Sequence, residues 1–187
     1  NYKVLFLQGG GIGENAFVPM NLIGRTGRAD YVISGDWSKK SAQEAAHFGQ
    51  IRIAANSEDN GRYTRVPSQA EWQLDPGAAY VHMCSNETIG GVEFFWTPDT
   101  GQVPLVADMS SNILSRPIDV SRYGLIYAGA QKNIGPAGLT IVIVREDLLG
   151  HALPGTPALL DLGAQADADS MINTPSTFSI YVAGLVF

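Results

Sequence analysis

Short apolar runs alternate with helix-forming segments along the first third of the chain, and this alternation limits the possible folds more than any other feature. Three apolar runs have the length of buried strands, at Val4–Leu7, Tyr31–Ser34 and Ile51–Ala54. Between them, residues 15–23 and 38–48 have helical composition, provided that Pro19 lies in a first turn or a kink. Ser38 is suited to cap the second helix and Gly49 to end it. Strands that alternate with helices typically form a mostly parallel sheet with helices on both faces.

The rest of the chain continues this pattern with shorter connections. Further strands are expected at Ala79–Met83, Val92–Trp96, Val103–Ala107, Leu125–Tyr127 and Leu139–Val144, and the short turns between the later ones allow an antiparallel edge. Ser68–Glu71 has the pattern of a capping box that opens a short helical turn. Residues 56–67 and 151–170 have the composition of loops, and Thr177–Phe187 has that of a buried helix. We therefore expect one α/β domain over residues 1–187.

Composition and charge exclude several classes of partner. The net charge of -6 and the pI near 4.9 argue against nucleic acid, whose phosphates need clustered Lys and Arg. No apolar run reaches the ~18 residues of a membrane span. Cys84 is the single cysteine, so no internal disulfide can form, and a cytoplasmic location is expected. The three histidines have no metal-site spacing.

Polar side chains follow the ends of four of the expected strands. They are Asp36 and Trp37; Asn86, Glu87 and Thr88; Asp108; and Gln131, Lys132 and Asn133. In sheets with parallel strands, ligands bind at the carboxyl ends of the strands. These residues are therefore the first candidates for a functional site.

The chemistry of these side chains suits pyridoxal phosphate (PLP). The Lys132 amine can form an imine with the cofactor's aldehyde, and Asp108 can keep the pyridine nitrogen protonated. Trp37 offers a flat face for the ring, and a tight turn at Gly9–Gly13 offers donors for the phosphate. Freed by substrate, Lys132 would be the base that moves the alpha proton. Each residue also has a structural explanation, such as Asp108 capping the segment that follows it, so composition and spacing alone do not fix the cofactor.

Four segments resemble motifs of the phosphoserine aminotransferase family, in the family's order. Tyr127–Gly138 is similar to the lysine motif, and Ala107–Pro117 to the aspartate segment. Cys84–Ile89 and Ser170–Pro175 resemble two further motifs. The resemblance covers nearly the whole chain and is weakest at residues 54–67 and 155–169.

The resemblance implies a class V, fold-type I PLP enzyme. The family interconverts 3-phosphohydroxypyruvate and glutamate with 3-phosphoserine and 2-oxoglutarate, in serine biosynthesis and, in many bacteria, pyridoxine biosynthesis. It implies that residues 1–187 are an incomplete large PLP-binding domain, because family members are longer at both ends. The apolar ending at Leu185–Phe187 also suggests a piece of a longer protein.

The resemblance also assigns roles to individual residues. Lys132 is implied as the Schiff-base lysine, Asp108 as the partner of the pyridine nitrogen, and Trp37 as the residue that stacks on the ring. Thr88 would reach the ring hydroxyl side, and Gln131 with the backbone of Gly11 and Ile12 would hold the phosphate. Asn173 and Thr174 match residues that reach the phosphate of the neighbouring subunit's cofactor, which implies a homodimer with shared sites.

The chain departs from the family pattern in its arginines and near the phosphate. Many relatives have a polar residue or arginine where Ile12 stands, so only a backbone contact is expected there. The family's substrate-binding arginines lie mostly in regions beyond residues 1–187, and Arg116 and Arg122 are expected to be structural. A fragment that lacks catalytic competence is therefore one alternative.

A dinucleotide-binding oxidoreductase domain is the other alternative. Gly11, Gly13 and Ala16 fit the G-x-G-x-x-A pattern after a strand, and Asp36 stands where a ribose-binding acid is found. That pattern is short and leaves the lysine motif and Asp108 unexplained, so the aminotransferase interpretation is preferred.

Overall fold

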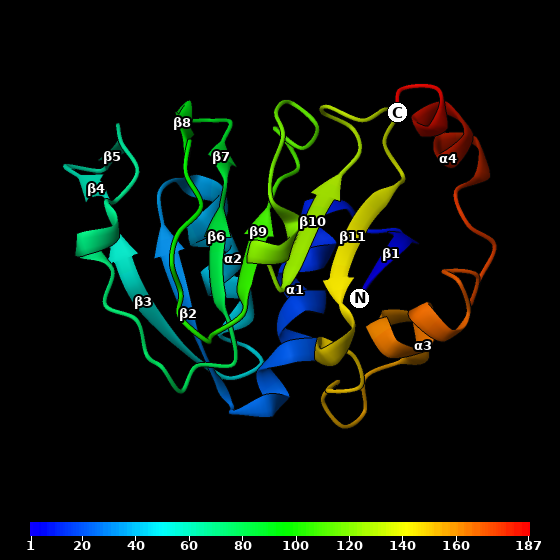
Figure 1. The fold of residues 1–187 in the computed structure, drawn as a ribbon, viewed down its shortest axis with the longest axis horizontal. Helices are drawn as coiled ribbons and strands as arrows, with labels where there is room; N and C mark the ends of the chain where they lie inside the picture. Colours follow the sequence, from blue (N-terminus) through cyan, green and yellow to red (C-terminus); the bar gives the residue numbers. More distant parts are fainter.

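The computed structural model describes all 187 residues and is built around a seven-stranded sheet (Figure 1). The strand order is β1-β11-β10-β9-β6-β2-β3. The strands are β1 Tyr2–Leu7, β2 Arg28–Ile33, β3 Gln50–Asn56, β6 Val81–Cys84, β9 Leu105–Asp108, β10 Leu125–Gly129 and β11 Thr140–Arg145. Two short hairpins lie outside the sheet, β4 Glu58–Asp59 with β5 Arg62–Tyr63 and β7 Asn86–Glu87 with β8 Val92–Glu93.

Strand direction is the feature of the sheet that bears on function. The strands β3, β2, β6, β9 and β10 pair in parallel, whereas β11 is antiparallel to both of its neighbours, β10 and β1. Only β11 therefore runs against the others, and the carboxyl ends of the remaining strands meet at one edge. This confirms the expected α/β fold with a mostly parallel sheet.

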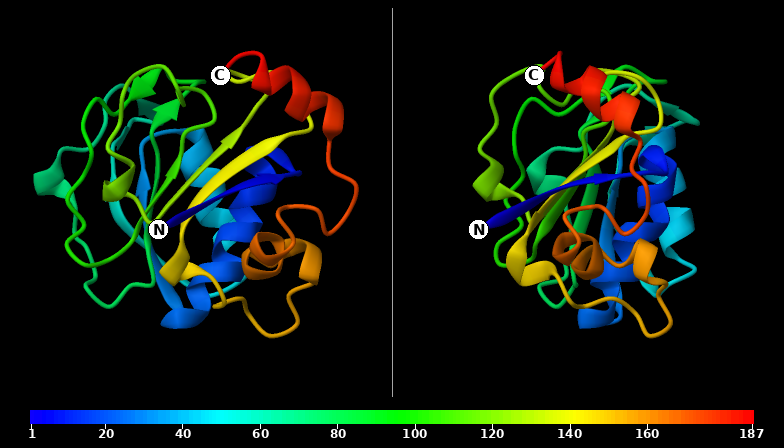
Figure 2. Two further views of the ribbon diagram at one scale, coloured as in Figure 1. Left: turned by 45° about the vertical axis from the view of Figure 1, so that its right-hand side comes forward. Right: turned by 90° about the vertical axis from the view of Figure 1, so that its right-hand side faces the viewer.

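Four α-helices accompany the sheet (Figure 2). They are α1 Gly10–Leu22, α2 Asp36–Ala45, α3 Leu162–Asp167 and α4 Thr177–Gly184. Short 3-10 turns occur at Ile23–Arg25, Gln69–Glu71, Val120–Arg122, Glu146–Leu148 and Ala158–Leu160. None of the helices combines the length and apolar character needed to cross a membrane.

The two faces of the sheet bury separate apolar clusters. Along β10, Leu125 and Tyr127 belong to one cluster, and Ile126 and Ala128 to the other, as the two-residue repeat of a strand requires. The helices α1, α2 and α3 pack on the Tyr127 side, whereas α4 contributes Ala183 to the opposite cluster. Helices thus contribute to both faces, but unequally.

Helix α1 begins at Gly10, and the expected start at Asn15 is wrong. Gly9 and Gly10 have φ angles of 116° and 63°, which only glycine adopts without strain, so the glycine run forms the helix start itself. Pro19 consequently lies inside α1 instead of in its first turn. The glycine-rich segment is therefore the first turn of a helix, not a loop before it.

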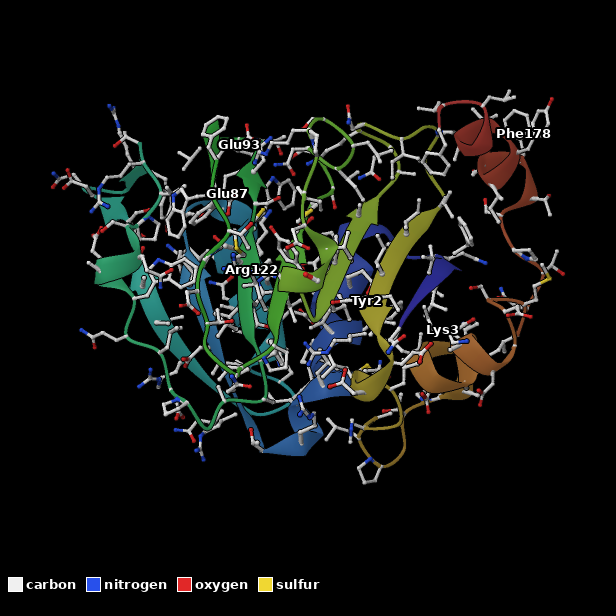
Figure 3. The ribbon with its side chains drawn as sticks, viewed as in Figure 1. Tyr2, Lys3, Glu87, Glu93, Arg122 and Phe178 are labelled. Atoms are coloured by element: carbon white, nitrogen blue, oxygen red, sulfur yellow. The ribbon has the colours of Figure 1, made fainter.

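Two other expectations near the carboxyl end are also wrong. The loop expected at residues 151–170 contains α3, because the Asp161 side chain accepts hydrogen bonds from Gly163 N at 2.8 Å and Ala164 N at 3.3 Å and so caps that helix. Helix α4 is largely exposed: Phe178 (Figure 3) and Tyr181 are 72% and 66% exposed, and only Ser179 and Ala183 are fully buried. The other expected strands and the second helix form, with boundaries shifted by a few residues, and the strand expected at Val92–Trp96 shrinks to β8. Ser38 does not cap the second helix, because α2 already begins at Asp36. The loop expected at residues 56–67 contains the β4–β5 hairpin, because Asn60 and Gly61, with φ angles of 50° and 76°, form a tight turn between the two strands.

One acidic side chain in the core has no hydrogen-bond partner. Glu14 on α1 is fully buried, and neither of its carboxyl oxygens makes a hydrogen bond. Burial, reinforced by the negative charge of Asp108, raises the pKa of Glu14 to about 8. Glu14 is therefore protonated in the folded chain at neutral pH.

This raised pKa predicts a pH-dependent loss of stability. Glu14 ionises near pH 4.5 in the unfolded chain and near pH 8 in the folded chain. The free energy of unfolding therefore falls as the pH rises between these values. The Glu14→Gln variant lacks this titration and should be more stable than the parent at pH 9, by on the order of 4 kcal/mol, and close to it at pH 4.5. Urea unfolding at both pH values measures the difference. Equal pH dependence of the parent and Glu14→Gln chains would contradict the assignment.

Candidate active site

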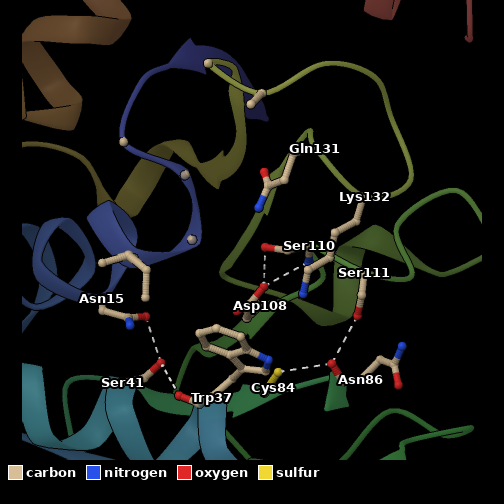
Figure 4. Close-up of a pocket in the computed structure, with 16 residues that line it drawn as sticks. Asn15, Trp37, Ser41, Cys84, Asn86, Asp108, Ser110, Ser111, Gln131 and Lys132 are labelled. Atoms are coloured by element: carbon tan, nitrogen blue, oxygen red, sulfur yellow. Dashed lines mark hydrogen bonds between the residues drawn. The ribbon is translucent and has the colours of Figure 1, made fainter. Parts of the chain in front are cut away.

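A cavity of about 420 Å³ opens at the edge of the sheet where the parallel strands end (Figure 4). Its walls come from the first turns of α1 and α2 and from residues at the ends of β6, β9 and β10. Helices α1 and α2 follow β1 and β2, which run in the same direction as β6, β9 and β10. The sheet topology therefore places all these elements around the cavity.

Asp108 is the last residue of β9 and presents one carboxylate oxygen to the cavity. Its Oδ1 accepts hydrogen bonds from Ser110 N at 2.8 Å and Ser110 Oγ at 2.6 Å, and Ser110 Oγ in turn accepts from Gly129 N at 3.0 Å. Its Oδ2 faces the first turn of α1, where a Cβ added to Gly11 would lie 3.7 Å from it. Burial raises the pKa of Asp108, opposed by the Ser110 hydrogen bonds and by the charge of Lys132.

Lys132, Thr88 and Trp37 form a connected group on the opposite wall. Lys132 Nζ donates a hydrogen bond to Thr88 Oγ1 at 2.8 Å, and Trp37 Nε1 donates to the same oxygen at 3.1 Å. Lys132 Nζ lies 5.3 Å from the centre of the Trp37 ring, and Lys40 Nζ lies 4.6 Å from it. The amine of Lys132 is thus held at the cavity mouth beside a flat aromatic surface.

The glycines of α1 and the side chain of Gln131 converge at the end of the cavity. Gly10 N donates to Thr140 Oγ1 at 2.7 Å, whereas the next amides of a helix start have no partner within the helix. A Cβ on Gly129 would lie 3.2 Å from Gly11 N and 2.6 Å from the Gln131 side-chain oxygen. The Gln131 amide and the Gly11 N–H therefore lie close together, which creates a group of donors suited to an anion.

The first turn of α2 is occupied by a side chain of the protein. Glu87 is fully buried and accepts hydrogen bonds from Trp37 N at 2.9 Å and Ser38 N at 2.8 Å. The start of α2 is therefore already satisfied, whereas that of α1 is open.

The structure brings most of the predicted site residues together. Gly11, Ile12, Trp37, Asp108, Gln131 and Lys132 line the cavity, and Thr88 joins it through its hydrogen bonds to Lys132 and Trp37. Asn173 and Thr174 do not: both are exposed in the segment between α3 and α4, and Asn173 borders a separate cavity of about 70 Å³ beside Phe6 and Phe17.

Several lining residues were missed by the sequence argument. Ser110 had a local signal, because an aspartate followed two positions later by serine forms a compact hydrogen-bonded turn. Asn15 and Ser41 had none, since their 2.7 Å hydrogen bond joins two different helices. Cys84 is buried and also lines the cavity, and burial raises its pKa well above the usual value, so its thiol stays protonated.

Other candidate residues have structural partners away from the cavity. Arg116 pairs with Glu93 at 2.6 Å, and Arg122 donates to the Pro98 carbonyl at 3.3 Å. His82 is buried against Tyr31 and Tyr127, and burial lowers its pKa to about 3. The glycines of the G-x-G-x-x-A pattern lie within α1, and Asp36 is an exposed residue that begins α2.

The cavity, its lysine and its buried aspartate have the arrangement of a cofactor-dependent transferase, and comparison with known families agrees. Residues 1–187 match the family model described as aminotransferase class-V. The chain belongs to the class-V aminotransferases.

Within that family, the chain is similar to phosphoserine aminotransferases. It is 63% identical to the phosphoserine aminotransferase of Herminiimonas arsenicoxydans, over 100% of this chain and 52% of that protein. The solved enzyme of Bacillus circulans subsp. alkalophilus shares 48% identity with a TM-score of 0.94, over 99% of this chain and 51% of the other. A PLP-bound phosphoserine aminotransferase from Trichomonas vaginalis shares 39% identity with a TM-score of 0.93, over 100% of this chain and 52% of that one.

Two conclusions follow from these likenesses. They confirm the expected fold class, the α/β large-domain fold of fold-type I PLP enzymes. The chain also spans about half the length of the relatives it matches.

The Asp108–Ser110 turn predicts a change in acidity that can be measured directly. Ser110→Ala removes the hydroxyl bond to Oδ1 and should raise the pKa of Asp108 further, because the charged form loses a donor. Asp119 and Ser121 form the same turn on the surface, so Ser121→Ala is the matched control and should raise the pKa of Asp119 in the same direction. Titration of both carboxyl carbons by NMR reports the two pKa values, and an unchanged Asp108 in Ser110→Ala would refute the role of this bond.

Proposed function

We propose that this chain provides the PLP-binding part of a phosphoserine aminotransferase. That enzyme transfers an amino group between glutamate and 3-phosphohydroxypyruvate to give 3-phosphoserine and 2-oxoglutarate, in serine biosynthesis and possibly pyridoxine biosynthesis. The observation that carries the proposal is that the Lys132 amine and the half-buried Asp108 carboxylate line one cavity. The PLP-bound relative from Trichomonas vaginalis supports it.

The cavity fits the ring of PLP at Asp108. With Oδ1 held by Ser110, only Oδ2 is available to a ligand, and a carboxylate in this buried position attracts a protonated ring nitrogen strongly. A protonated ring nitrogen would also reverse the raised pKa of Asp108, because opposite charge favours the ionised carboxylate. Asp108 is therefore the group that would keep the nitrogen protonated.

The phosphate of the cofactor fits the first turn of α1. The Gly11 and Ile12 amides and the Gln131 side chain supply donors there, and the positive end of the helix favours an anion. The start of α2 cannot compete, because Glu87 occupies it. Ile12 contributes only its backbone, since its side chain is exposed.

Trp37 and Thr88 would hold the ring between these two ends. The Trp37 ring lies beside Lys132 Nζ and offers the flat apolar surface on which an aromatic cofactor stacks. Thr88 Oγ1, already an acceptor for Lys132 and Trp37, keeps its own hydroxyl hydrogen for the ring hydroxyl side of the cofactor.

Lys132 would both attach the cofactor and move the proton. When bound, the cofactor's ring withdraws electrons from the bond to be broken on the substrate's alpha carbon. Lys132 Nζ, released when substrate takes its place, would carry the proton at that carbon. Its hydrogen bond to Thr88 keeps the amine at the cavity mouth, within reach of a substrate that enters from solvent.

The proposal includes a homodimer with shared sites. Asn173 and Thr174 lie outside the chain's own cavity and are exposed, as residues that serve a neighbouring subunit must be. The exposed apolar side chains of Phe178, Tyr181 and Leu185 nearby provide surface that a partner can bury. A cytoplasmic location is part of the proposal and is supported by the single, buried and unpaired Cys84.

A second candidate function is PLP binding without turnover. Arg116 and Arg122, which lie close to the family's aspartate segment, are engaged away from the cavity, so no arginine of this chain is assigned to the substrate's anionic groups. We therefore expect cofactor binding to be separable from transamination in this chain.

Covalent trapping tests the role of Lys132. The chain with added PLP should give a yellow absorbance band, and borohydride should fix the cofactor to Lys132, detectable by peptide mapping. Lys132→Ala should abolish the trapped product, whereas Lys39→Ala should not, because Lys39 pairs with Glu58 on the surface. Equal trapping in the Lys132→Ala chain would exclude the assignment.

Mixed dimers test the shared site. A dimer of one Asn173→Ala chain and one Lys132→Ala chain has one site with both residues intact and one that lacks both. Borohydride should therefore trap PLP on the Asn173→Ala chain of the mixed dimer at parental cofactor affinity, and weakly in the Asn173→Ala homodimer. Equally weak trapping in dimers shown to be mixed would argue that Asn173 does not serve the partner's site.

A further inference from the structure

Glu87 joins the loop that carries Thr88 to the helix that carries Trp37. It ends β7 (Figure 3) and has no exposed surface. Its two carboxylate oxygens accept hydrogen bonds from consecutive amides of α2, Trp37 N and Ser38 N. The residue before α2 is Gly35, which has no side chain to cap the helix. The Glu87 carboxylate, which comes from β7, therefore caps the start of α2 in place of a local side chain.

The local packing is shaped around this carboxylate. A Cβ added to Gly35 would collide with the Glu87 side chain, so the glycine leaves the space that the carboxylate fills. Charged acceptors on helix-start amides make short and strong hydrogen bonds, and these measure 2.9 Å and 2.8 Å. The start of α2 is thus fixed by two hydrogen bonds to a buried side chain from another element.

The two ends of Trp37 are held by neighbouring residues. Glu87 holds its backbone amide, and Thr88, the next residue, accepts from its indole Nε1 at 3.1 Å. The plane of the Trp37 ring is therefore determined by residues 87 and 88 together. Glu87 itself does not line the cavity.

We propose that Glu87 is a positioning residue that fixes the plane of the Trp37 ring against the cofactor. This inference rests on the proposed function. Glu87 acts through Trp37 and not by touching the cofactor. A residue that served only to anchor the loop would affect the stability of the chain without any dependence on Trp37.

A double-mutant cycle with Trp37 separates these roles. Glu87→Gln keeps the size of the side chain but turns one acceptor into a donor that faces a helix amide. PLP affinity, measured by absorbance titration, should weaken about tenfold, the size of one lost charge-assisted hydrogen bond. In the Trp37→Ala background the same substitution should weaken it by less than about threefold, because its effect passes through the ring that this variant lacks. The visible circular dichroism of the bound cofactor should also change in Glu87→Gln.

Two further variants control for folding. Glu71→Gln removes a carboxylate from the capping box of a distant surface turn and should leave PLP affinity and cofactor dichroism unchanged. Gly35→Ala keeps Glu87 but displaces its carboxylate, so it should reproduce the Trp37-dependent loss even if Glu87→Gln fails to fold.

The outcomes distinguish this inference from the proposed function. Failure of the parent chain to bind PLP, in folded dimeric form, would overturn the proposed function. Parent binding together with equal fold losses for Glu87→Gln and Gly35→Ala in the Trp37 and Trp37→Ala backgrounds would overturn the positioning role alone. A loss confined to the Trp37 background would support it.

Discussion

The parallel pairing of β10, β9, β6 and β2 is the constraint on which the rest of the structure depends. Because these strands run in one direction, their carboxyl ends and the helices that follow them meet at one edge. Residues separated by nearly a hundred positions, such as Trp37 and Lys132, approach there without any long loop. The antiparallel β11 between β10 and β1 then brings the glycine start of α1 to the same edge.

Buried carboxyl groups define the electrostatics around this edge. Glu14 lies unpaired in the core, Asp108 is half satisfied by Ser110, and Glu87 is fully satisfied by α2. The surroundings of each carboxyl group determine its role. Glu14 stays protonated, Glu87 uses both oxygens to hold the start of α2, and Asp108 keeps one oxygen available to a ligand. Negative potential near Asp108 and open helix amides at α1 then favour a ligand that is cationic at one end and anionic at the other. PLP, with a protonated ring nitrogen and a phosphate, has that polarity.

The sequence predicted the location of those site residues that directly follow a strand of the sheet. Asp108, Lys132 and Trp37 follow strands of the same direction, so placing the strands was enough to gather them. The start of α1 could not be predicted, because glycine normally ends helices and only the left-handed angles of Gly9 and Gly10 make a start possible here. The exposure of α4 was equally hidden, since an apolar helix on the surface has the same composition as one that enters the core. Asn15, Ser41 and the contact between Glu87 and α2 depend on tertiary packing, which no local pattern reports.

A crystal structure of the chain soaked with PLP would show whether this cavity holds the cofactor in one orientation. We expect density for the phosphate at the Gly11 and Ile12 amides and Gln131, with the ring nitrogen beside Asp108 Oδ2 and the Trp37 plane against the ring. Density with the phosphate at the start of α2, or with the ring nitrogen away from Asp108, would refute this mode of binding.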